Sequence, residues 1–285
     1  MTINLHDKNL SEQERQGVER LLESQNPHIT DDLEQIWYLL DKTWRDMGCD
    51  NARLNWQTIA KFYAHPVWLL NGLFIETHEV SMQIRQHIAS YIRKQNFQYI
   101  CDYGGGFGTL AREIARVCPD VRIDIYEPFP SQYGKKCIEA FHNIHFVSEL
   151  KKEQYDCLIS TDVLEHVDHV LDTFNTMLES LKIGGQALIG NCFYPVIECH
   201  LPKHFHFRYT FTYIATLMGV THLGKIEGAD YVQIYYKSKP TRVNLAARVT
   251  GGGSRCLYPL LNMARFVLRP CVKILRTLKN RKDTQ

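Results

Sequence analysis

The sequence contains no apolar run long enough to cross a membrane. A spanning helix needs roughly 18 consecutive apolar residues, and the longest candidate, residues 66–75, is about half that length. The first thirty residues are polar and acidic, without the basic start and apolar run of a secretory signal. Nine cysteines are present without a Cys-x-x-Cys pair, which favours reduced, buried thiols over a disulfide framework. These absences predict a globular, cytoplasmic protein.

Net charge is small in total but unevenly distributed. The 285 residues carry +2. Ten Lys or Arg against one acid give +9 from Arg242 onward, so the preceding 241 residues carry −7. The acidic body argues against a nucleic-acid partner, and the basic tail favours an anionic surface. With 45% hydrophobic residues the chain can form a sizeable core, which excludes a disordered or collagenous protein.

Hydrophobic periodicity predicts that the first 95 residues are mainly helical. Apolar residues between 33 and 44 follow the 3.6-residue period after an acidic start at 31–32. Two further helical runs cover residues 51–63 and 75–94. The apolar segment 65–74 between them contains Pro66 and Gly72, so we expect a loop that either packs into the core or lines the mouth of a pocket.

From Tyr99 onward, short apolar runs alternate with amphipathic helices. Strands are expected at residues 99–103, 121–126, 144–147, 155–160 and 186–190, with helices at 110–117, 131–141 and 171–181. This alternation predicts an α/β fold whose doubly wound parallel sheet is covered on both faces. A helix over 209–218, strands over 221–227 and 231–237, and a linker over 239–254 should follow.

A glycine loop follows the first expected strand, in the order Asp102-Tyr-Gly104-Gly105-Gly106-Phe-Gly108. Glycines there permit positive φ and let a ligand approach backbone N–H groups at a helix N-terminus. Thr109 stands where a dinucleotide fingerprint needs its third glycine, and the Gly-Lys-Ser/Thr of a nucleoside-triphosphate loop is absent. The spacing therefore favours neither a nicotinamide dinucleotide nor a nucleoside triphosphate.

The second expected strand ends in an acid, Glu127, about 20 residues after the loop. A carboxylate at that strand tip accepts hydrogen bonds from both hydroxyls of a ribose. The alternative is that Glu127 only caps the turn into Pro128-Phe129-Pro130. The spacing favours the ribose, and so a nucleoside that lies across the strand tips.

Four motifs together resemble, in order and spacing, those of class I S-adenosylmethionine-dependent methyltransferases. They are the glycine loop from Asp102, Glu127, the segment Asp162-Val-Leu-Glu165-His166-Val, and Leu181-Lys-Ile-Gly184-Gly185-Gln-Ala-Leu. The resemblance covers roughly residues 98–238. It implies a seven-stranded Rossmann-like sheet with an antiparallel last strand, and S-adenosyl-L-methionine as the methyl donor.

The resemblance also implies which residues hold the cofactor. The loop of Gly104, Gly105, Gly106 and Gly108 would wrap the methionine portion while Asp102 orients the loop. Glu127 would hold the ribose, and Asp162 would lie beside the sulfonium and the amino acid. For the adenine, Ser148 and Glu149 after the third strand are both candidates.

Two histidines are candidate general bases. His166 follows the fourth strand at the edge where ligands of open α/β sheets bind, and His204 lies in the polar segment after the fifth strand. A metal site from Cys199, His200, His204 and His206 lacks the paired spacing of a zinc site, so no metal is expected. Taken singly, His200 and His206 are expected at the surface or in supporting hydrogen bonds. Asn191, Tyr194 and Tyr209 are candidate acceptor contacts.

The acceptor is expected to be a small organic molecule. In similar enzymes an Asn-Pro-Pro-Tyr type sequence marks amino-group methylation of nucleic acid or protein, and residues 160–163 read Ser-Thr-Asp-Val instead. Tyr63, Trp68 and Phe74 suggest a closed pocket at the joint with the helical region. We expect O-methylation of a sugar, lipid-linked or secondary-metabolite hydroxyl. The alternatives are a non-catalytic nucleoside-binding module and another S-adenosylmethionine-using enzyme, such as a decarboxylase or aminopropyl transferase.

The predicted organisation has three parts: a helical cap over residues 1–95, a methyltransferase domain over 96–238, and a linker with a basic amphipathic helical tail over 239–285. In the tail, Arg265, Arg269, Lys273 and Arg276 share one helical face, and Pro270 should break the helix. The tail is expected either to pack on the acidic body or in a dimer, or to contact an anionic membrane from the cytoplasmic side, at the inner membrane surface.

Overall fold

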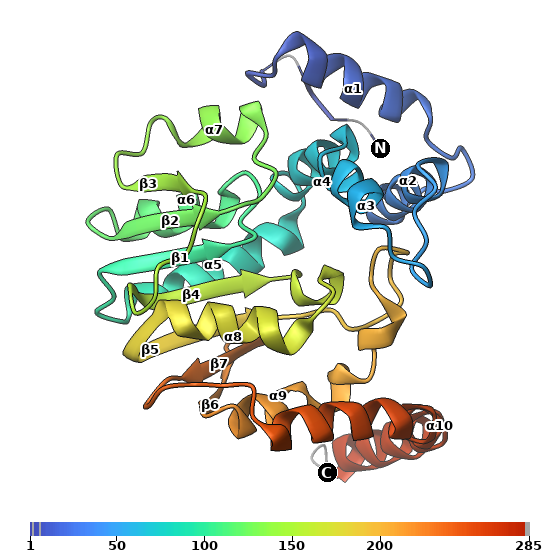
Figure 1. The fold of residues 1–285 in the computed structure, drawn as a ribbon. Helices are drawn as coiled ribbons and strands as arrows, with labels where there is room; N and C mark the ends of the chain where they lie inside the picture. Colours follow the sequence, from blue (N-terminus) through green and yellow to red (C-terminus); the bar gives the residue numbers. More distant parts are fainter. Residues whose placement is uncertain (2, 6, 283–285) are drawn as a thin grey trace.

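The computed structural model describes the chain except residues 2, 6 and 283–285, with side chains up to Met263. Its centre is one seven-stranded sheet in the order β3-β2-β1-β4-β5-β7-β6 (Figure 1). The first five strands in the chain pair in parallel, and β7 is antiparallel to both β5 and β6. The Rossmann-like sheet and its antiparallel last strand are therefore confirmed. The strands are β1 (Tyr99–Tyr103), β2 (Arg122–Tyr126), β3 (Ile144–Val147), β4 (Tyr155–Thr161), β5 (Leu181–Gly190), β6 (Thr221–Ile226) and β7 (Ala229–Tyr236).

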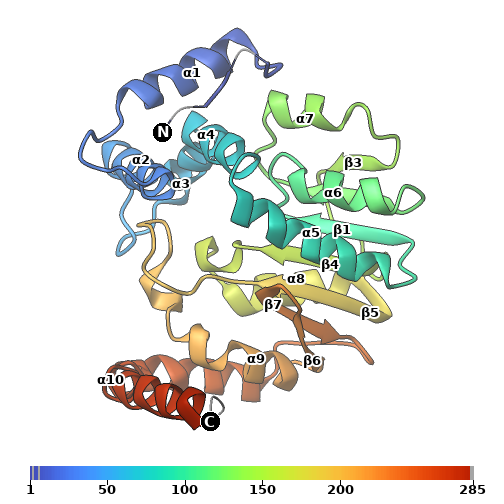
Figure 2. The same ribbon diagram turned by 180° about the vertical axis from the view of Figure 1, so that it is seen from behind.

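Helices cover both faces of this sheet, as the alternating pattern predicts (Figures 1 and 2). One face packs on α5 (Glu79–Arg93) and α6 (Thr109–Val117), and the other on α8 (Val170–Ser180) and α9 (Phe207–Leu217). The strands are apolar on both sides because each face is buried: Ile100 faces the first pair of helices and Cys101 the second. The short α7 (Gln132–Ile138) precedes β3.

Four N-terminal helices form a cap with its own apolar core. They are α1 (Glu12–Glu23), α2 (Asp32–Asp46), α3 (Trp56–Tyr63) and α4 (Pro66–Ile75). Their core includes Phe107 of the glycine loop, Tyr133 of α7 and Cys199 of the segment after β5. Figures 1 and 2 show the cap grouped at one end of the sheet, where the parallel strands finish. The cap therefore touches the loops that carry the predicted site.

The loop expected at residues 65–74 is helix α4, which corrects that prediction. Pro66 occupies the first helical turn, where its missing N–H costs nothing, and the His65 side chain accepts the Val67 N–H. Gly72 is needed inside this helix because a Cβ there would lie 2.3 Å from the Phe107 ring. The segment does pack into the core, one of the two expectations for it.

The linker expected at residues 239–254 is also wrong from Leu245 onward, because α10 spans Leu245–Lys282. Its first turns pack on α9, with Ala247 fully buried and Ser254 bonded to His206. This packing outweighs the weak helix propensity of the glycine triplet at 251–253. The described backbone stays helical through Pro270, so the expected break is absent. The predicted charged face from Arg265 to Arg276 lies outside the described side chains.

In the part of the chain that the structure describes, no helix is both long and apolar enough to span a membrane. The eight cysteines with described side chains are all free, as expected for reduced thiols.

Candidate active site

The glycine loop forms a cradle between β1 and α6 that only glycine can build. Gly104, Gly106 and Gly108 have φ angles of 73°, 54° and 71°, in the left-handed region. A Cβ on Gly105 would lie 2.5 Å from Oδ2 of Asp102, whereas a Cβ on Gly106 would meet no atom within 4 Å. The cradle is therefore tight against Asp102 below and open above Gly106, where a ligand can reach the backbone.

Glu127, at the tip of β2, is bonded to this loop. Its Oε2 accepts the Gly106 N–H at 3.1 Å, and its Oε1 accepts the Phe129 N–H at 3.0 Å. Burial raises the pKa of the carboxyl, and the two N–H donors oppose that shift. Glu127 thus caps the turn that follows it, which was the alternative considered from the sequence. It also lies beside the cradle, at the place predicted for the ribose.

Beneath the loop, Asp102 is almost fully buried, and its Oδ2 has no hydrogen-bond partner among the described residues. Burial raises its pKa to about 7, although the positive charge of Arg85 opposes the shift. Arg85, on α5, also lowers the pKa of Asp162, and its Nε is buried without a partner in the described structure. The sequence did not predict Arg85 as a site residue, because it lies before the glycine motif on a helix with no distinctive pattern.

Asp162 follows β4 in a strained conformation. Its φ is +56°, which a non-glycine residue rarely adopts. Its N–H donates to the Gly190 carbonyl, and its Oδ2 accepts the Tyr231 hydroxyl at 3.3 Å. Burial raises its pKa to about 6. The next residue, Val163, lies against the glycine loop, since a Cβ on Gly104 would be 2.5 Å from its Cγ2 atom.

Ser148 and Glu149 come directly after β3, and both are exposed. They lie on the same edge as Glu127, because β2 and β3 pair in parallel with Tyr126 opposite Val147. The choice between them for the adenine stays a prediction.

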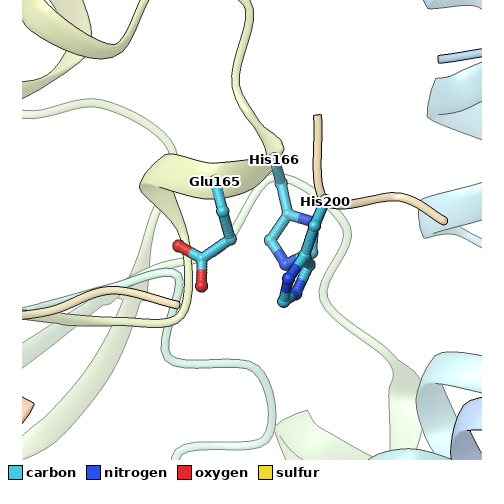
Figure 3. A group of neighbouring side chains, drawn as sticks. All are labelled: Glu165, His166 and His200. Carbon is cyan, nitrogen blue, oxygen red and sulfur yellow. The ribbon is translucent and has the colours of Figure 1, made fainter. Parts of the chain in front are cut away.

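The short helical turn Leu164–His166 brings Glu165 and His166 against His200 from the segment after β5. One donor atom from each of the three lies within 4.8 Å of the others (Figure 3). Glu165 is fully buried; its Oε1 accepts the Cys192 N–H at 2.8 Å, and its Oε2 has no partner among the described residues. Burial, with the nearby charge of Asp162, raises the pKa of Glu165 to about 8.

Both histidines of this group are held as neutral rings. Burial lowers the pKa of His166 to about 3, and burial also lowers that of His200. Nδ1 of His166 donates to the Cys199 carbonyl at 3.1 Å, and Nδ1 of His200 to the Tyr194 carbonyl at 2.8 Å. Because a carbonyl can only accept, each Nδ1 carries the proton and each Nε2 keeps a lone pair.

The other candidate base, His204, has a different environment. It is buried, its Nε2 is bonded to the Val167 carbonyl at 2.7 Å, and its ring packs near Phe207. Of the two candidate bases, only His166 belongs to the group around Glu165, and it keeps a ring nitrogen free there. His206 is bonded through Nδ1 to Ser254 of α10. The four-residue metal group considered from sequence is thus not assembled among the described side chains.

Aromatic residues of the cap pack around His166. The rings of Tyr63 and Trp68 each lie 5.9 Å from it in edge-on contact. The indole N–H of Trp68 is buried and has no partner in the described structure. Phe74, predicted with these two, instead packs on His78 in the core of the cap.

The three residues predicted to contact the acceptor lie in different environments. Asn191 follows β5 directly and has a buried Oδ1 without a partner among the described residues. Tyr194 provides its carbonyl to His200 and its ring to Arg208. Tyr209 packs on Tyr258 of α10, and its hydroxyl donates to Asn262 of the same helix.

The comparisons with known proteins agree with this geometry. A family model described as a methyltransferase domain matches residues 74–206, from the end of α4 through the glycine loop, Glu127, Asp162 and His200. With the strand order and the cradle, this match identifies a class I S-adenosylmethionine-dependent methyltransferase domain in the chain, with S-adenosyl-L-methionine as its methyl donor. Methyl transfer is thereby favoured over the two alternatives, a non-catalytic module or another use of the cofactor.

Among solved structures the similarity is distant. A candidate S-adenosyl-L-methionine-dependent methyltransferase from Methanococcus maripaludis shares 18% identity over 56% of this chain and 88% of its own, with a TM-score of 0.44. An O-methyltransferase family protein from Burkholderia thailandensis shares 16% identity over 72% of this chain and 70% of its own, with a TM-score of 0.49. Human N-acetylserotonin methyltransferase in complex with SAM shares 20% identity over 73% of this chain and 68% of its own, with a TM-score of 0.47. No curated protein matches the sequence.

Proposed function

We propose that this methyltransferase acts on a hydroxyl group of a small organic acceptor. The observation that carries the proposal is the wall around His166: Tyr63 and Trp68 from the cap place an apolar surface, and one unpartnered N–H, beside a histidine with a free ring nitrogen. A covered site of this kind suits a small molecule better than a nucleic-acid or protein chain.

The chain's residues would hold the cofactor as follows. Gly106 leaves room for close approach of the ligand, and Glu127, already oriented by two backbone N–H groups, accepts the ribose hydroxyls. Arg85, whose charge acts on both Asp102 and Asp162, would pair with the carboxylate of the methionine portion. The bound cofactor supplies an electrophilic methyl group on a sulfonium.

Methyl transfer is an in-line displacement, so the protein mainly has to align the reacting atoms and exclude water. The cap does the second of these, since its aromatic residues cover the strand tips. An alcohol is a poor nucleophile, which is why a proton acceptor is needed for it. Nε2 of His166 has the lone pair to accept that proton, with Nδ1–H fixed on the Cys199 carbonyl. Because burial lowers the pKa of this ring to about 3, the proton transfers as the O–CH₃ bond forms and the oxygen becomes acidic.

Incubation of the purified chain with methyl-labelled S-adenosylmethionine and a cell extract tests the proposal. We expect label in an extractable small molecule, as a methyl ether stable to mild base. Label in protein or nucleic acid, or in a methyl ester or amine, would contradict it. The Glu127→Ala chain serves as the negative control, because it lacks the acceptor for the ribose hydroxyls.

We also propose a peripheral membrane contact through α10. Leu257, Leu260 and Met263 are 54%, 59% and 60% exposed and recur at helical spacing. The sequence that follows is strongly basic. An apolar face with a cationic rim is what binding to an anionic surface requires.

A further inference from the structure

The group formed by Glu165, His166 and His200 has the composition of a metal site. Its three donor atoms lie within 4.8 Å of one another, and they come from two segments that the fold brings together, the turn after β4 and the segment after β5. Figure 3 shows the two imidazole rings side by side, with the carboxylate on the neighbouring residue of the same turn. Two imidazoles and one carboxylate are a common donor set for divalent transition ions.

The hydrogen bonds around the group leave one ring nitrogen of each histidine and one carboxyl oxygen of Glu165 free to bind a metal ion. Each histidine donates Nδ1–H to a backbone carbonyl, which fixes the ring and leaves Nε2 to coordinate. A second bond of this kind is usual for metal-binding histidines, because it selects the tautomer and orients the ring. Of the Glu165 carboxylate only Oε1 is engaged, by the Cys192 N–H.

The remaining carboxyl oxygen of Glu165 is one of the buried polar atoms for which the described residues supply no partner. Oε2 of Glu165 is buried and has no partner in the described part of the chain, and the residue has no exposed surface. A buried carboxyl oxygen without a hydrogen-bond partner is costly. A cation held by this carboxyl group and the two imidazoles would supply the missing partner.

We propose that Glu165, His166 and His200 bind a divalent metal ion such as Zn²⁺ or Mn²⁺. Three protein ligands leave at least one coordination position for water or substrate, as in catalytic rather than structural sites. The position lies next to the rings of Tyr63 and Trp68, which pack on His166.

The role of the ion in catalysis rests on the proposed function. An acceptor hydroxyl that binds the ion has a lowered pKa and loses its proton to water. Its oxygen then forms the new O–CH₃ bond as the S–CH₃ bond breaks, and the sulfur keeps the electron pair as a neutral thioether. In this arrangement Nε2 of His166 binds the ion and does not accept the proton. The ion then activates the hydroxyl in place of the histidine.

Metal binding is tested on the full chain without reference to activity. EDTA-treated protein is titrated with Mn²⁺ by electron paramagnetic resonance and with Zn²⁺ by calorimetry. We expect one ion per chain, and affinity at least about tenfold lower in Glu165→Gln and His200→Gln. Glutamine at 165 keeps an acceptor for the Cys192 N–H, so that variant should stay folded, as circular dichroism would verify. His169→Ala removes an exposed histidine of the same segment and should bind like the unmutated chain.

No stoichiometric binding of either ion, or equal affinity in all the variants, would overturn the site. Once an acceptor is known, EDTA should abolish methyl transfer and added metal should restore it. If the ion binds but EDTA does not affect methyl transfer, the catalytic role of the ion is overturned and the binding site still stands. If no acceptor is ever labelled, the proposed function fails, and the titration still decides whether the ion binds.

Discussion

At the scale of single residues, local sequence was enough to group the residues proposed to hold the cofactor. Asp102, the glycines and Glu127 stand at spacings that the backbone chemistry dictates, and the structure places them together. Arg85 was not predictable, because a cation on a preceding helix carries no local signal. Glu165 and His200 were missed as partners for a similar reason: their meeting depends on how the segment after β5 folds back over β4.

Arg85 gives the first prediction. Arg85→Gln should weaken binding of S-adenosylmethionine about tenfold or more, since a charge-assisted hydrogen bond to the carboxylate contributes about 1.5–3 kcal/mol. Binding of 5′-methylthioadenosine, which lacks the amino-acid carboxylate, should hardly change. Arg93→Gln, at the exposed end of the same helix, is the matched control for both titrations. An equal loss for both ligands would show that Arg85 only supports the fold.

Among the elements, the strands were predicted better than the helices that flank them. The runs at 99–103 and 144–147 became β1 and β3 with the same bounds, because short apolar stretches between polar turns have few alternatives. Helix α4 was missed because it is apolar on every side, so its period carries no signal. The start of α10 was missed because burial of Ala247 and Ser254 on the neighbouring helix, which sequence does not show, overrides three glycines.

The junction between the cap and the sheet gives the second prediction. Glu76, just after α4, pairs with Lys8 and Arg112 and accepts the Tyr133 hydroxyl. Burial opposes its ionisation, but the hydrogen bond from Lys8 and the charge of Arg112 outweigh it and lower the pKa below the usual 4.5. Ionised Glu76 therefore stabilises the fold above about pH 4.5, and this contribution is lost as the pH falls through the lowered value.

Glu76→Gln should cost about 1–3 kcal/mol in the free energy of unfolding at neutral pH. The difference from the unmutated chain should shrink towards about pH 3, where both chains carry a neutral side chain at this position. Urea denaturation across this range measures it, with the exposed Glu79→Gln as control. A penalty that does not depend on pH would contradict the ion-pair account.

At the scale of the whole molecule, the cap and the tail are additions to the sheet and its flanking helices. The cap lies over the strand tips, whereas α10 packs on α9 and continues beyond it (Figure 1). The proposed membrane contact predicts that the full chain floats with anionic liposomes at low salt and not with neutral ones. A chain ending at Met263 keeps the packed part of α10 and should stay unbound. Full-length protein that stays unbound at low salt would end the membrane proposal.

The central claim is that the glycine cradle holds S-adenosylmethionine, and a calorimetric titration tests it most directly. We expect micromolar binding by the unmutated chain and none by Gly106→Val, whose side chain would fill the open space above the loop. Gly48→Val is the matched control, because Gly48 also has a positive φ with no atom near its Cβ position and lies in the cap. It should bind like the unmutated chain. No binding by the unmutated, folded protein, or unchanged binding by Gly106→Val, would contradict the account.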